Sequence, residues 1–133
     1  MPADPVRVLI VDDKRLFADT LRLFLERDTR IEIVGVATDA ADAIDLAVAN
    51  EADVVLMDIT MPRMNGVEAT RKLLSRRPSA RVLILSGVSA DSMESEALEA
   101  GAVGFLLKGS LGDEVVDRIL EVAPGPRPEG RSA

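Results

Sequence analysis

The sequence of 133 residues contains no cysteine, no histidine, no tryptophan and no tyrosine. Because cysteine is absent, a disulfide framework, a thiol nucleophile and a cysteine-rich zinc site are all excluded. Because histidine is absent, the chain lacks the commonest general base and the commonest ligand of transition metals. Any site chemistry is therefore expected to depend on oxygen ligands.

The sequence also lacks the features of membrane, secreted and nucleic-acid-binding chains. No apolar run approaches the roughly 20 residues that a membrane span needs, and residues 1–5 have neither the basic start nor the apolar stretch of a secretion signal. The net charge of −7 argues against direct contact with nucleic acid, because phosphate contacts need clustered Lys and Arg. We therefore expect one cytoplasmic domain that contacts neither membrane nor nucleic acid.

Short apolar runs rich in β-branched residues alternate with helical patterns along the whole chain. The first, third and fourth runs are almost entirely apolar, which is typical of parallel strands that are buried on both faces. Five such units are too few to close a barrel. We therefore predict an α/β fold, a flavodoxin-like, doubly wound sheet of five parallel strands in the order 2-1-3-4-5 with five helices. The predicted strands cover residues 6–11, 31–37, 53–57, 81–85 and 104–107.

Local signals mark several of the predicted helix ends. Asn65 and Ser110 each stand three positions before an acidic residue, a spacing that is a variant of the capping box at helix starts. Gly101 follows a helical stretch where a left-handed residue commonly ends a helix. We therefore predict helices that start after Asn65 and Ser110, and one that ends before Gly101.

Polar side chains follow four of the five predicted strands, directly after the apolar run in each case. Asp12 and Asp13 follow the first strand, Asp58 the third, Ser86 the fourth and Lys108 the fifth. In an open parallel sheet, ligands bind at the carboxyl ends of the strands, where the strand order reverses. Each residue alone is more typical of a turn or of the surface, but together their positions predict one shared site.

Three acids at one edge of a sheet need a cation. Two unit charges about 4 Å apart repel by roughly 4 kcal/mol at an effective dielectric of 20, so Asp12, Asp13 and Asp58 cannot all ionise cheaply by themselves. Mg²⁺ suits a shell of carboxylates, a backbone carbonyl, waters and phosphate oxygens. A carboxylate beside that ion can attack a phosphoryl group, and Lys108 and Ser86 can bind the remaining phosphoryl oxygens. The predicted product is an aspartyl phosphate.

Four stretches of the sequence, taken together, are highly specific to one family of proteins. They are VLIVDD at residues 8–13, DVVLMDITMPRMNG at 53–66, VLILS at 82–86 and AGAVGFLLK at 100–108. Together they closely resemble the receiver domain of bacterial two-component response regulators, and the resemblance covers residues 6–122. We therefore expect a receiver domain at residues 1–122 and a Pro/Gly-rich tail or truncated linker at residues 123–133. Residues 30–37 and 81–86 are most similar to receivers joined to a helix-turn-helix, LuxR-like output domain.

The resemblance implies a role for each acid of the site. Asp58 would be the phosphoacceptor, and Mg²⁺ would be held by Asp12, Asp13, Asp58 and the backbone carbonyl of Thr60. The donor would be a sensor histidine kinase, so the protein would be a signalling switch rather than an enzyme. Thr60 and Val88 occupy the positions that help to orient the hydrolytic water in this family, and neither offers a carboxylate or an amide. Loss of the phosphoryl group is therefore expected to be slow.

The resemblance also implies how phosphorylation changes the surface. Ser86 and Lys108 would bind the new phosphoryl group, and Phe105 would occupy the space that the Ser86 hydroxyl leaves. The changed surface would comprise the fourth helix, the fifth strand and the fifth helix, and it could support a homodimer. The output would be transcriptional control through a DNA-binding domain, or the protein contacts of a stand-alone receiver, and the sequence leaves both open.

Two glycines depart from the family pattern. Gly109 follows Lys108 where proline is common, so we expect a trans peptide bond and a looser loop there. Gly87 follows Ser86 where alanine is common, which should widen the access to Asp58.

Two rival functions fit the sequence less well. A Mg²⁺-dependent phosphatase similar to the haloacid dehalogenase family would place an acid two positions after the nucleophile of the first strand, and this chain has Lys14 two positions after Asp12. A degenerate receiver that binds partners without phosphorylation would ordinarily lack one of the five site residues. All five are present.

Overall fold

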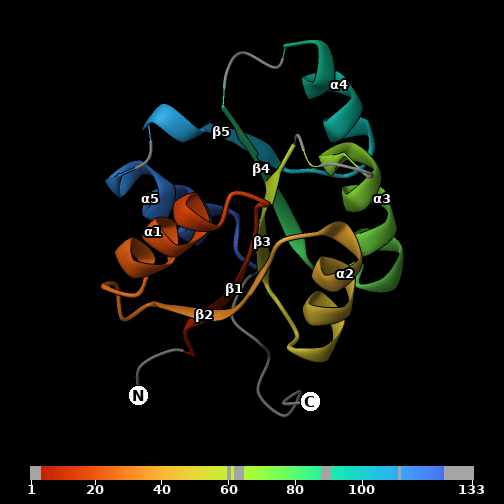
Figure 1. Cartoon of the computed structure of the whole chain (residues 1–133). Coiled ribbons are helices and arrows are strands. Elements are labelled where there is room, and N and C mark those ends of the chain that lie inside the picture. Colours follow the sequence, from red (N-terminus) through yellow and green to blue (C-terminus); the bar gives the residue numbers. More distant parts are fainter. Residues whose placement is uncertain (1–3, 60, 62–64, 88–90, 111, 125–133) are drawn as a thin grey trace.

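The computed structural model describes residues 4–59, 61, 65–87, 91–110 and 112–124, and of residues 91–94 and 110 it describes the backbone alone. The strands are β1 (Val6–Val11), β2 (Ile31–Ala37), β3 (Val54–Asp58), β4 (Arg81–Ser86) and β5 (Gly104–Leu107). They form one parallel sheet in the order β2-β1-β3-β4-β5 (Figure 1). The predicted flavodoxin-like α/β fold and its strand order are therefore confirmed.

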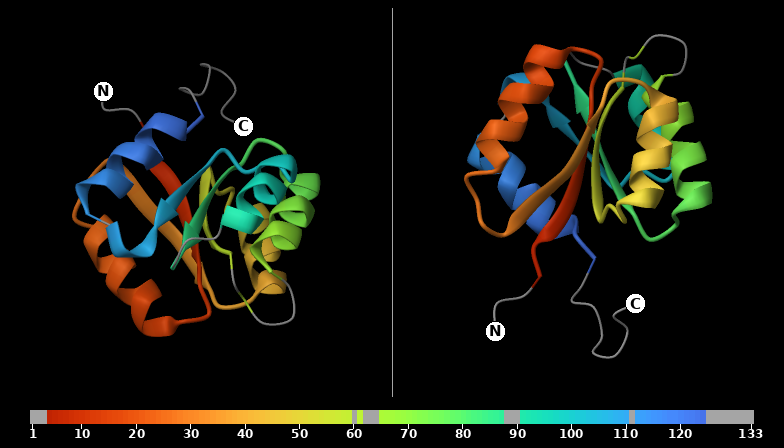
Figure 2. Two further views of the ribbon diagram at one scale, coloured as in Figure 1. Left: turned by 90° about the horizontal axis from the view of Figure 1, so that it is seen from above. Right: turned by 60° about the horizontal axis from the view of Figure 1, so that its bottom comes forward.

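Helices cover both faces of this sheet. They are α1 (Arg15–Leu25), α2 (Ala40–Ala49), α3 (Gly66–Arg76), α4 (Asp91–Glu99) and α5 (Asp113–Val122), with a short 3-10 helix, η1 (Lys108–Ser110), between β5 and α5. Helices α1 and α5 pack on one face, and α2, α3 and α4 pack on the other (Figure 2). Among the described residues, every helix is too short or too polar to span a bilayer.

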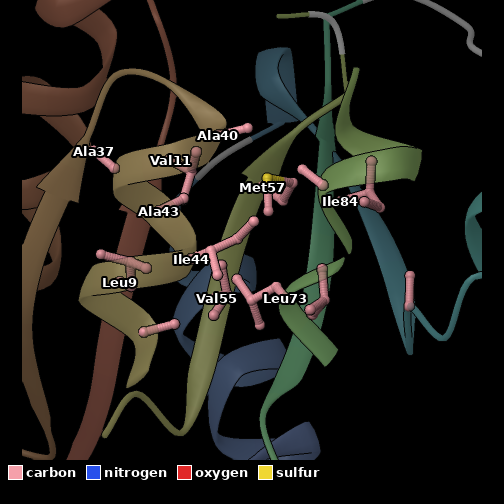
Figure 3. Packing of buried hydrophobic residues seen from close by; sticks show 14 of the residues in the cluster. Leu9, Val11, Ala37, Ala40, Ala43, Ile44, Val55, Met57, Leu73 and Ile84 are labelled. Carbon is pink, nitrogen blue, oxygen red and sulfur yellow. The ribbon is translucent and has the colours of Figure 1, made fainter. Parts of the chain in front are cut away.

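Two apolar layers hold the helices against the sheet, because successive strand residues point to opposite faces. On the face covered by α2, α3 and α4, Leu9 and Val11 of β1 share a buried cluster with Ile44 and Leu73 (Figure 3). On the other face, Val8 belongs to the cluster that α1 and α5 complete. Full burial of an aliphatic side chain of this size stabilises the fold by about 1.5–3 kcal/mol. The near-continuous apolar runs of the sequence thus reflect burial on both faces.

The predicted helix ends are confirmed at Asn65 and Gly101 and are wrong at Ser110. Asn65 is the N-cap of α3, and its side-chain oxygen accepts a hydrogen bond of 2.9 Å from the backbone N–H three residues on. Gly101 lies just beyond α4 with a φ of 115°, in the region that favours glycine. Ser110 has the capping spacing, but the chain first winds into η1, so that α5 begins later with Gly112 as its N-cap.

Candidate functional site

The polar residues that end the strands lie together at the carboxyl edge of the sheet, as predicted. Parallel register aligns the strand ends, since Asp58 is opposite Leu85 and Ser86 is opposite Leu107. Asp58 and Ser86 are the last residues of β3 and β4 rather than the first residues after them, whereas Asp12 directly follows β1. Strand pairing therefore extends through Asp58 and Ser86, and both side chains are buried.

Asp12, Asp13 and Asp58 form an acidic cluster. One carboxylate oxygen from each lies within 4.8 Å of the others. Asp12 and Asp58 are fully buried, and Asp13 is partly buried. The backbone N–H of Lys14 donates to Oδ1 of Asp12 at 2.8 Å, which orients this carboxylate. Ionised carboxylates this close to one another repel in a buried setting, so the acidic cluster needs positive charge.

Lys108 supplies part of that positive charge. Its Nζ lies 2.6 Å from Oδ2 of Asp12 and 3.6 Å from Oδ2 of Asp58, and its side chain is only 14% exposed. Lys14 pairs with Asp13 at 3.7 Å, but its side chain is 63% exposed and solvent weakens that pair. Three carboxylates against one buried ammonium leave an excess of two negative charges, which matches a divalent cation.

An aromatic ring on α1 also contacts Lys108. The Nζ atom lies 4.6 Å from the centroid of the Phe17 ring, within the range of a cation–π interaction. Sequence reasoning missed this contact, because Phe17 there belongs to the apolar stripe of an amphipathic helix. Phe17 is only four residues beyond Asp13, and this short spacing was the available signal. The pair borders a cavity of about 280 Å³ that is lined by Phe17, Thr20, Leu21, Phe24, Lys108 and Gly112.

The first residue of α3 lies against the backbone that carries the central acid. A Cβ atom on Gly66 would lie 2.5 Å from the carbonyl oxygen of Asp58 and 2.7 Å from Cα of Ile59. The backbone N–H of Gly66 donates to the carbonyl of Ile59 at 2.9 Å. Glycine therefore allows α3 to begin directly beside the end of β3, a role that the sequence motif did not reveal.

Phe105, the predicted switch residue, lies in β5 opposite Ile84 of β4. It is half-buried and packs against the apolar cluster on the side of α2, α3 and α4. Thr60, predicted as a ligand through its carbonyl, lies outside the described residues, and so does Val88.

The two glycines beside the site have open surroundings. Apart from its chain neighbours, no atom of the described residues would lie within 4 Å of a Cβ atom on Gly87 or on Gly109. The peptide bond between Lys108 and Gly109 is trans, as expected for a glycine at this position. A side chain at either position would therefore have open space around it.

Known proteins resemble this chain in sequence. Residues 8–120 match the family profile described as the response regulator receiver domain. The transcriptional regulatory protein DegU of Brevibacillus brevis is 38% identical over 120 residues, which are 90% of this chain and 51% of DegU. The chain thus spans about half the length of the curated relatives that it matches.

Solved structures resemble it in fold. A two-component response regulator of the LuxR family from Aurantimonas sp. SI85-9A1 superposes with a TM-score of 0.84 at 33% identity, covering 90% of this chain and 85% of that one. A chain of the CheX–CheY–BeF3–Mg²⁺ complex from Borrelia burgdorferi superposes with a TM-score of 0.79 at 28% identity, covering 90% of each chain. The predicted similarity to LuxR-like receivers is confirmed.

Proposed function

The chain belongs to the response regulator receiver domain family, and on that premise we propose that it is the phosphoacceptor of a two-component phosphorelay. Asp58 receives the phosphoryl group, and a sensor histidine kinase is the donor. The position of Asp58 carries this proposal, because it is fully buried at the end of β3 in the acidic cluster and within reach of Lys108. The phosphohistidine of the donor cannot be one of these 133 residues, since none of them is histidine.

The proposed reaction is a transfer of the phosphoryl group between two side chains. A carboxylate oxygen of Asp58 forms the new bond to phosphorus, and the bond from phosphorus to the imidazole nitrogen of the donor breaks, with its electron pair kept by the imidazole. The Nζ of Lys108, 3.6 Å from Oδ2 of Asp58, is close enough to neutralise charge on the phosphoryl oxygens. We assign the hydroxyl of Ser86, at the end of the neighbouring strand β4, to a hydrogen bond with a phosphoryl oxygen.

We propose Mg²⁺ as the cofactor. The excess of two negative charges and the all-oxygen donors of the acidic cluster fit a hard divalent ion. Asp12, Asp13 and Asp58 would hold it together with the backbone carbonyl of Thr60. When bound, the ion would supply positive charge to the carboxylates and to the phosphoryl oxygens. The presence of Mg²⁺ in the similar CheX–CheY–BeF3–Mg²⁺ complex supports this assignment.

We further propose that phosphorylation is transmitted to the surface formed by α4, β5 and α5. Ser86 and Phe105 would move together, because β5, which carries Phe105, is paired with the strand that ends in Ser86. Since DegU is a transcriptional regulatory protein, we propose transcriptional control through a DNA-binding domain outside residues 1–122, with a homodimer formed on phosphorylation. A stand-alone receiver that acts by protein contacts is the second candidate. In both cases the protein is a signalling switch rather than an enzyme, and residues 123–133 are a linker or a tail.

Labelling with a small phosphodonor tests the proposal. Acetyl phosphate with Mg²⁺ should add one phosphoryl group to the wild-type protein, as measured by intact-mass spectrometry, and a chelator should prevent it. Asp58→Ala should abolish the labelling. The control Asp45→Ala removes an exposed carboxylate from α2 and should be labelled like the wild type. Equal labelling of the Asp58→Ala variant would disprove the assignment of the phosphoacceptor.

A further inference from the structure

The contacts of the Lys108 ammonium are of two kinds. Oxygen atoms of Asp12 and Asp58 lie 2.6 Å and 3.6 Å from it, and both carboxylates belong to the proposed reacting site. The ring of Phe17 lies 4.6 Å from it, measured to the ring centroid. This ring is therefore a contact of the ammonium that lies outside the acidic cluster.

The backbone next to Lys108 is open although the lysine side chain itself is largely buried. Gly109 follows it directly and Gly112 precedes α5, and a Cβ atom on either glycine would meet no atom of the described residues within 4 Å beyond its chain neighbours. The cavity of about 280 Å³ between α1 and this segment is lined by Lys108 itself, so the side chain has space to leave the carboxylates. The position of the ammonium therefore depends on its side-chain contacts.

We propose that Phe17 is a positioning residue that holds the ammonium of Lys108 at the phosphoacceptor, and this inference rests on the proposed phosphorylation of Asp58. The negative face of the ring attracts the ammonium. The ring is itself held in place, because Phe17 packs against the buried cluster that joins α1 and α5 to the sheet.

A ring serves this purpose differently from a carboxylate. Asp12 and Asp58 attract Lys108 through their negative charge, and that attraction weakens when a cation or a new ester bond neutralises them. The Phe17 ring is neutral and binds neither a hard divalent ion nor a phosphoryl group. Its attraction for Lys108 therefore persists while the charge of the acidic cluster changes, and it keeps the ammonium beside Asp58 during the transfer.

Substitution of the ring tests this role through the rate of phosphorylation. Phe17→Leu keeps an apolar side chain but removes the π face, and we expect a roughly tenfold slower labelling of Asp58 by acetyl phosphate, which corresponds to a contact of about 1.4 kcal/mol. Phe17→Trp keeps an aromatic face and should retain the wild-type rate. Phe24→Leu is the matched control, because Phe24 lies further along the same helix and lines the same cavity. It should also be labelled at the wild-type rate.

Repeating the substitution in a Lys108→Met variant separates an effect on the position of the ammonium from an effect on the packing of α1. Lys108→Met removes the ammonium, so Phe17→Leu should cause no further loss of rate in this background if the ring acts through Lys108. An equal loss in both backgrounds would overturn the inference, and so would a wild-type rate for Phe17→Leu alone. A wild-type protein that is not labelled at all would overturn the proposed function together with this inference, so the two failures are distinguishable.

Nuclear magnetic resonance provides a measurement that does not depend on labelling. The ε-methylene protons of Lys108 lie beside the face of an aromatic ring and should resonate upfield of those of Lys14 and Lys72, the other lysines of the chain. The upfield shift should disappear in Phe17→Leu and persist in Phe24→Leu. Identical Lys108 shifts in the wild type and in Phe17→Leu would overturn the inference even if the labelling rates differed.

Discussion

Replacement of Gly66 by alanine should destabilise the fold and displace the proposed phosphoacceptor. The new Cβ would lie 2.5 Å from the carbonyl oxygen of Asp58 and 2.7 Å from Cα of Ile59, and both are backbone atoms that cannot rotate away. Comfortable contacts need about 3.5 Å, so α3 or the end of β3 must move by about 1 Å. Overpacking costs roughly 1–3 kcal/mol, and the higher helix propensity of alanine offsets up to about 1 kcal/mol. We expect a net loss of about 1–2 kcal/mol in the free energy of unfolding.

Thermal unfolding and labelling with acetyl phosphate measure the two consequences of Gly66→Ala. The melting temperature should fall by several degrees in a domain of this size, and the shift of Asp58 should slow its labelling. Gly87→Ala is the matched control for stability, because a Cβ there would meet no atom of the part of the chain that the structure describes within 4 Å, its chain neighbours aside. That variant should melt at or above the wild-type temperature. If Gly66→Ala both melts and is labelled like the wild type, the close approach of α3 to β3 does not constrain the site.

Metal binding, dephosphorylation and one surface ion pair lead to further predictions. Mg²⁺ at about 100 times the dissociation constant should add roughly 2.7 kcal/mol to the free energy of unfolding through linkage, and so raise the melting temperature. Asp13→Asn should weaken this effect. A wild-type melt that is independent of Mg²⁺ would contradict the metal site. The phosphorylated double variant Thr60→Asn, Val88→Glu should decay faster than the wild type, because an amide and a carboxylate can orient the hydrolytic water; equal decay would show that these side chains do not set the lifetime. Hydrogen bonds from Arg30 lower the pKa of Asp28 from 3.8 to about 2, so this pair stabilises the fold above pH 3.8 and the stabilisation is lost as the pH falls toward 2. Arg30→Gln should return the pKa toward 3.8 in an NMR titration, and an unchanged midpoint would refute the role of Arg30.

Local patterns in the sequence were sufficient to predict the fold and the membership of the acidic cluster. Nearly continuous apolar runs predict strands that are covered on both faces, and the observed burial of β1 and β3 agrees. The strand order was taken from the common doubly wound arrangement, and it agrees with the polar residues that end four of the five runs, because that order makes those four strands neighbours. That argument brought Asp12, Asp13 and Asp58 together before any distance was known.

The contacts across the sheet edge were decided by the tertiary structure alone. Periodicity assigns a residue to a face or an edge, but the partner of a side chain depends on where the helices pack and which rotamers that packing allows. For this reason the closer pairing of Lys108 with Asp12 than with Asp58, and its contact with Phe17, were not predicted. The close approach of Gly66 to the end of β3 has the same origin, since it joins backbone segments that only the packing of α3 brings within contact distance.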